Sequence, residues 1–108
     1  MTEKLKEVSS VSTTNDYAAL ITLNVPSPIG KLLFFLKEEN TNAVLYKIQG
    51  AMDEDFTYHA DLKGETTLAK NGSAYETLSE PWLWVRVMHK AASAGNQGKT
   101  TCKISGGA

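Results

Sequence analysis

Three side chains in this sequence could act as a nucleophile or a general base: His59, His89 and Cys102. Cys102 and His89 would be neighbours if the last two predicted strands pair. However, Cys102 falls on the inward face of its predicted strand with Ile104, where a cysteine behaves as a small apolar residue. A Cys–His pair also needs a third group that orients the histidine, and donors for an oxyanion. We therefore expect no catalytic residue and no enzyme activity.

An acidic stretch offers the best metal ligands in the chain, Asp53, Glu54 and Asp55. Calcium takes several oxygen ligands from such loops, but the alternating spacing of a calcium-binding loop is missing, and acidic turns are usually solvated. The stretch from Gly95 to Thr101 superficially echoes the end of a phosphate-binding loop. That motif must open a helix, and here the sequence continues into a strand. We expect no metal and no cofactor.

Composition limits the kinds of partner that this chain can have. Its 108 residues suit one domain, and a net charge of −1 argues against nucleic acid, which normally requires a basic face. The single cysteine excludes an internal disulfide framework. The N-terminus lacks the apolar stretch of a signal peptide, and the longest apolar run, Leu32 to Leu36, is too short to span a bilayer. Neither nucleic acid nor a membrane is expected as a partner.

Apolar residues alternate with a period of two along most of the chain, which predicts strands and no helix. Proline, glycine and asparagine separate these segments, at Pro26 to Gly30, at Lys63-Gly64 and at Asn71-Gly72. The expected strands are 17–25, 31–37, 43–49, 74–78, 82–90 and 99–105, with two shorter ones at Phe56 to Tyr58 and Thr66 to Leu68. About eight short strands predict an all-β, jelly-roll-like antiparallel two-sheet sandwich. An immunoglobulin sandwich is less favoured because the paired cysteines are absent.

The polar start of the chain predicts a division into three parts. Residues 1–16 have little to bury and should form a flexible N-terminal arm, residues 17–105 the β-sandwich domain, and residues 106–108 a flexible tail. The arm is either a frayed terminus or a segment that becomes ordered on a neighbouring subunit. In the second case, Val8 and Val11 are the expected contacts.

The segment from Trp82 to Lys90 is the most informative one for binding. Leu83, Val85 and Val87 form an inward face, so the opposite face carries Trp84, Arg86, Met88 and Lys90. Tryptophan, arginine and methionine are enriched in protein interfaces. We expect these four residues to form a protein interface, although a loop of the same chain could also cover them. Leu32 to Leu36 is apolar on both faces and is either a central strand or one partly covered by another subunit.

Two stretches together carry a family resemblance: Val44 to Asp53, and Glu65 to Ala69 followed by Gly72-Ser73 and Pro81 to Val87. Their order resembles small β-sandwich structural proteins of tailed bacteriophage virions, which decorate capsids or form head–tail and tail parts. The resemblance implies a non-enzymatic structural protein that assembles as repeated copies, with capsid decoration or stabilisation favoured over a tail role. It implies copies of itself and a larger capsid or tail protein as partners. The implied location is the virion, after synthesis in the host cytoplasm.

The pattern also looks like galactose-binding jelly-roll modules, so a carbohydrate-binding module is the competing hypothesis. Trp82, Trp84, Tyr75 and Tyr58 could provide a stacking surface for a sugar ring. Asp53 or Asp55 would then fix the hydroxyl groups of the sugar.

Overall fold

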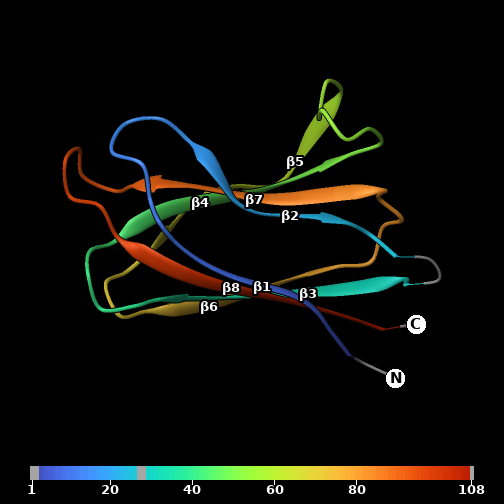
Figure 1. Cartoon of the computed structure of the whole chain (residues 1–108), viewed down its shortest axis with the longest axis horizontal. Helices are drawn as coiled ribbons and strands as arrows, with labels where there is room; N and C mark the ends of the chain where they lie inside the picture. The colour runs from blue at the N-terminus through green and yellow to red at the C-terminus, as the bar shows by residue number, and fades with distance from the viewer. Residues whose placement is uncertain (1–2, 27–28, 108) are drawn as a thin grey trace.

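Two four-stranded antiparallel sheets pack face to face in the computed structural model, which describes residues 3–26 and 29–107 (Figure 1). The strands are β1 (Glu3–Val11), β2 (Ala18–Asn24), β3 (Lys31–Glu38), β4 (Val44–Ala51), β5 (His59–Leu68), β6 (Ser73–Leu78), β7 (Trp84–Ala91) and β8 (Lys99–Gly107). Sheet A has the order β1-β8-β3-β6, and sheet B has the order β2-β7-β4-β5. Over these ranges no helix is formed, and so none that could cross a membrane.

Most successive strands lie in opposite sheets, and the first strand pairs with the last. Eight strands connected in this way form the two interlocked Greek keys of a jelly roll. The predicted all-β, jelly-roll-like antiparallel sandwich is therefore confirmed. The turn expected at Asn71-Gly72 is also present, with Asn71 at a φ of 58° and the Gly72 N–H bonded to the Ala69 carbonyl.

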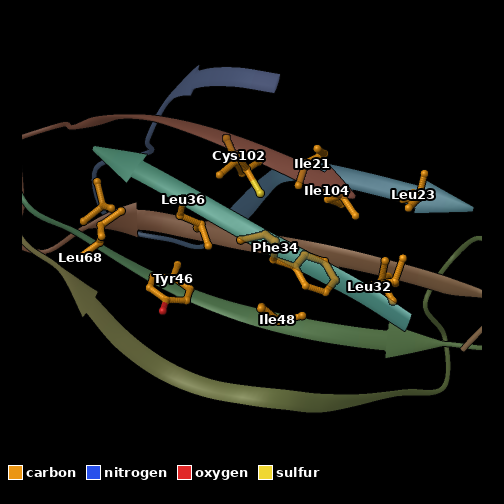
Figure 2. Close-up of a cluster of buried hydrophobic side chains, with 14 residues drawn as sticks. Ile21, Leu23, Leu32, Phe34, Leu36, Tyr46, Ile48, Leu68, Cys102 and Ile104 are labelled. Carbon is orange, nitrogen blue, oxygen red and sulfur yellow. The ribbon is translucent and has the colours of Figure 1, made fainter. Parts of the chain in front are cut away.

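The core lies between the sheets and consists of the inward side chain of every second residue. Thr100, Cys102 and Ile104 on β8 are buried, as their alternation predicts. Figure 2 shows how side chains from both sheets meet in this layer. Its large members are Leu20, Ile21, Leu23, Leu32, Phe34, Leu36, Val44, Tyr46, Ile48, Leu68, Val85 and Val87.

A buried carboxylate ties together the loops at one end of the sandwich. Glu38 has no exposed surface, and its oxygens accept bonds from the backbone N–H groups of Asn71 (2.8 Å), Thr41 (2.9 Å), Lys99 (3.2 Å) and Asn42 (3.4 Å). Burial alone would raise the pKa of Glu38, but these backbone hydrogen bonds outweigh it and lower the pKa. Glu38 therefore fixes three chain segments with one charge.

The structure corrects the expectation of a flexible arm for most of its length. Residues 3–11 form β1, which pairs with β8 in eight register positions, and Leu5 and Val8 pack against the core. An edge strand needs only one partly apolar face, and its hydrogen bonds come from a strand about a hundred residues away in sequence. Gly106 and Gly107, expected in a flexible tail, are the last residues of β8.

Three details of the predicted strands are also different. Residues 56–58 belong to a loop, and Lys63-Gly64 lies within β5, where register shifts against β4 mark an irregularity in place of a turn. A register shift between Ala19 and Ile21 reverses part of β2, so Leu20 is buried and Ala19 is exposed. The predicted number of strands agrees with the observed number because the missed β1 offsets the short strand predicted at 56–58, which is a loop.

Candidate functional site: the two outer faces of the sandwich

Of the three groups that could perform chemistry, His89 and Cys102 are buried in different sheets and His59 is exposed. His89 lies on β7 in sheet B and Cys102 on β8 in sheet A, so the pairing of their strands does not occur. Burial lowers the pKa of His89 from 6.5 to about 4 and raises the pKa of the Cys102 thiol from 9.0 to about 12. His59 is exposed, and its Nδ1 lies 2.7 Å from the carbonyl oxygen of Phe56. Across residues 3–26 and 29–107, no three potential metal ligands cluster.

The outer face of sheet B carries the residues that the sequence assigns to an interface. Trp84, Arg86, Met88 and Lys90 alternate with the fully buried Val85 and Val87, so all four point away from the core. Leu83, expected inward, lies before β7 and is about half exposed. Trp82 packs against the core and leaves no room for a side chain at Gly50.

Part of this face is covered by the chain itself. The Arg86 guanidinium lies 4.2 Å from the ring centroid of Phe56, and Arg86 Nε donates to Gln49 Oε1 at 2.8 Å. At the other end of β7, Lys90 Nζ lies 4.8 Å from the ring centroid of Tyr17. Burial and the hydrogen bond to Glu65 raise the pKa of Tyr17. Arg86 and Lys90 thus have partners within the chain, whereas Trp84 and Met88 have only partial cover.

The acidic loop, residues 52–58, leaves the sheet beside Trp84, because Ala51 pairs with both Trp84 and His59. Phe56 anchors this loop: it is buried, has a φ of 53°, and its N–H donates to the Asp53 carbonyl at 3.2 Å. The Thr57 N–H donates to Asp53 Oδ2, also at 3.2 Å. Met52 and Tyr58 remain 58% and 84% exposed, so a fixed loop presents two large apolar side chains to solvent.

The outer face of sheet A contains a second exposed apolar surface that sequence reasoning located only in part. Glu7, Lys103, Phe35 and Tyr75 are successive cross-strand neighbours on β1, β8, β3 and β6, and we call them the aromatic row. Phe35 is 41% exposed and Tyr75 is 68% exposed. β3 is a central strand, yet its outward side chains stay uncovered. The doubly apolar pattern at Leu32 to Leu36 was the available signal, but Tyr75 joins it only through the register of β6.

Two shallow hollows lie beside this row. One, of about 340 Å³, is lined by Phe35, by the charged residues Lys37, Lys103, Glu7 and Glu39, and by Ser9 and Thr101. The other, also about 340 Å³, lies toward the start of β3 and is lined largely by apolar atoms around Leu33 and Leu78. Phe35 therefore lies beside one hollow lined by charges of both signs and near one apolar hollow.

The other residues for which the sequence predicts a binding role do not lie together on one surface. Val8 packs against the chain's own core, while Val11 is 55% exposed at the end of β1. The four aromatic residues of the sugar-binding hypothesis do not form one platform, because Tyr75 lies on sheet A and Trp84 on sheet B. Trp82 is packed against the core, and Tyr58 projects from the acidic loop.

Comparisons with known proteins give similarity of fold. No family model matches the sequence, and no curated protein matches it. A crystal structure of PirA matches with a TM-score of 0.63 at 9% identity, covering 97% of this chain and 96% of that one. A subunit from Bacillus endospore appendages, described as disulfide-linked pili, matches with a TM-score of 0.57 at 16% identity, covering 98% and 86%. The capsid structure of Helicobacter pylori bacteriophage KHP30 gives a TM-score of only 0.39 at 15% identity, covering 98% and 93%. The chain thus shares its whole fold with the first two.

Proposed function

We propose that this chain is a non-enzymatic structural protein that assembles as repeated copies on or within a phage-like virion, with capsid decoration favoured over a tail role. The observation that carries the proposal is that each outer face of the sandwich has an exposed apolar surface. One is the acidic loop beside sheet B, and the other is the aromatic row on sheet A. Contiguous exposed apolar side chains mark interaction sites more often than they mark the surface of a monomer. His89 and Cys102 are buried and lie on neither surface.

The fold adds support of a coarser kind. The endospore appendage subunit uses the same fold in a pilus, which is an assembly of repeated copies. Jelly rolls also occur in viral capsids. Cys102 is the single cysteine of the chain and is buried, so it cannot link copies by a disulfide. The contacts between copies would therefore be noncovalent. The proposed location is a virion or a similar particle.

Light scattering after size exclusion tests the proposal on the purified full chain, and Trp84→Ala tests whether the outer face of β7 takes part. We expect mass above that of a monomer at high protein concentration, and roughly tenfold weaker association for Trp84→Ala with unchanged folding. Trp82→Ala is the matched control, because it removes a tryptophan from the core and none from the outer face. It should lower the free energy of unfolding by about 3 kcal/mol. A strictly monomeric wild type would contradict the proposal.

The capsid role can be tested separately by the reading frames that adjoin this gene. Capsid, portal or head-protease genes on either side would support decoration of the head. A run of tail genes would move the proposal to the tail, and genes for sugar uptake or degradation would favour the carbohydrate-binding alternative.

A further inference from the structure

Two surfaces of this chain carry opposite charge. The outer face of sheet A presents more basic than acidic side chains, namely Lys4, Lys37, Lys99 and Lys103 against Glu7 and Glu39. In the described part of the chain Lys103 forms no ion pair, although it lies in the middle of the aromatic row. The acidic loop carries Asp53, Glu54 and Asp55 and no basic residue. The two surfaces are therefore electrostatically complementary.

Their apolar parts are complementary as well. The acidic loop offers Met52 and Tyr58, which are long side chains with more than half of their surface exposed. The outer face of sheet A offers two hollows of about 340 Å³, one lined mainly by apolar atoms and one by Lys37, Lys103 and two glutamates, with Phe35 beside the second. Large side chains that enter hollows, surrounded by charges, are the usual arrangement of an interface centre and its rim.

The acidic loop is already fixed in the free chain. Phe56 is clamped under the Arg86 guanidinium, and two N–H bonds to Asp53 hold the turn. A loop that is held in one conformation before it binds loses little entropy on association. Docking through this loop therefore retains more of its contact energy than docking through a loose segment would.

The two surfaces lie on opposite sides of the molecule. Figure 1 shows the yellow-green segment that leads into β5 rising from sheet B, on the side away from β1, β8, β3 and β6. One copy cannot bring its own loop to its own aromatic row, but it can offer the loop to a second copy. A contact between two different surfaces is head-to-tail and continues from copy to copy, closing as a ring or running as a filament.

From this arrangement we infer that the acidic loop of one copy docks on the aromatic row of the next copy. The inference rests on the proposed assembly function and names the partner and the contact. The partner is a second copy because both halves of the complementary pair are present on every chain. Electrostatic attraction then selects the pairing of loop with row over the pairing of like surfaces.

Charge reversal on each surface of the full chain tests the contact by sedimentation velocity. The row variant is Lys103→Glu, and the loop variant combines Glu54→Lys with Asp55→Lys. Each variant alone should associate at least roughly tenfold more weakly than the wild type, because like charges now face each other. An equimolar mixture of the two variants should recover association, since each copy then meets a partner of opposite charge at both surfaces. Electron microscopy of the wild type distinguishes rings from filaments.

Lys70→Glu is the matched control, because it makes the same charge change at an exposed turn between β5 and β6, at the other end of β5 from the acidic loop and outside the aromatic row. It should leave association unchanged, and circular dichroism should show all variants folded. Association of both reversed variants at wild-type strength would overturn the inference while leaving the assembly function standing. The inference also fails if the mixture stays dissociated or if Lys70→Glu dissociates the assembly equally. A monomeric wild type would overturn both proposals.

Discussion

At the scale of single residues, burial shields two of the three side chains that could have been reactive, His89 and Cys102. His89 is 1% exposed, and among the described residues its Nδ1 has no hydrogen-bond partner. Cys102 is fully buried, and its strand, β8, lies between β1 and β3. Sequence alternation was sufficient to place Cys102 inward, because period-two burial is a local property of a strand. It could not show that β7 and β8 belong to different sheets, because that depends on the topology of the whole chain.

Replacement of His89 should make the protein less sensitive to acid. Its pKa is about 4 in the folded chain and 6.5 when exposed, so the unfolded state binds the proton more tightly. The stability of the wild type therefore falls as the pH drops from 6.5 to 4, by a total of about 3 kcal/mol from this group. Urea unfolding of His89→Leu at pH 7 and pH 4.5 should show a smaller loss than the wild type shows. His59→Gln is the control, and equal losses in all three proteins would contradict the prediction.

At the scale of elements, local pattern predicted the bounds of six strands well and missed β1 and most of β5. β3, β4, β7 and β8 carry clear alternation of buried side chains, and their bounds differ from the predicted ones by one or two residues. β1 contains only Leu5 and Val8 as core contacts, and Leu5 lies at a register shift between Lys4 and Lys6. Its pairing with β8 supplies the stabilisation, and no local pattern reveals a partner at the other end of the chain.

For the candidate surfaces too, the sequence predicts some features and not others. The alternation of β7 was enough to point Trp84 and Met88 outward. Arg86 was equally outward by pattern, but its contact with Phe56 depends on a loop with a left-handed residue that the sequence does not announce. The aromatic row needed the pairing of Phe35 with Tyr75, which is set by the register between β3 and β6. Sequence predicts which side chains face outward but does not predict which of them become neighbours.

Val8→Asp tests whether β1 is part of the folded domain. Val8 packs against the core opposite Cys102, so a carboxylate there would have to be buried without a partner or detach the strand. We expect the free energy of unfolding to fall by about 3 kcal/mol, measured by urea denaturation. Val11→Asp makes the same substitution at an exposed position of the same strand and should change stability by less than about 0.5 kcal/mol. Equal small effects would show that β1 contributes little.

At the scale of the whole molecule, the sandwich depends on contacts between distant parts of the chain. β8 is the strand that joins β1 to β3, so sheet A has no continuous order without it. Glu38 adds a second long-range link, from the end of β3 to the backbone at Lys99. Such non-local pairing implies that folding is cooperative and comparatively slow.

Deletion of residues 99–108 should therefore abolish folding altogether, and not merely shorten one sheet. Loss of near-ultraviolet dichroism and of dispersed amide resonances would show this result. The control is insertion of a short glycine-serine linker after Gly95, which lies in an exposed loop with a φ of 84° and open space around it. The insertion should leave the fold intact, because β8 stays connected and loops tolerate added length. A folded truncation would disprove the central place of β8.

The reactivity of the single cysteine can be used to measure local opening of the native structure. Cys102 is the one thiol in the sequence, and it faces the core from the strand between β1 and β3. With a pKa near 12, the thiol stays protonated at neutral pH and is shielded from reagents until β8 separates from its neighbours. The rate at which a thiol reagent modifies the native protein then reports how often that strand opens. Copies held in a particle should be modified more slowly than free copies if assembly holds sheet A closed.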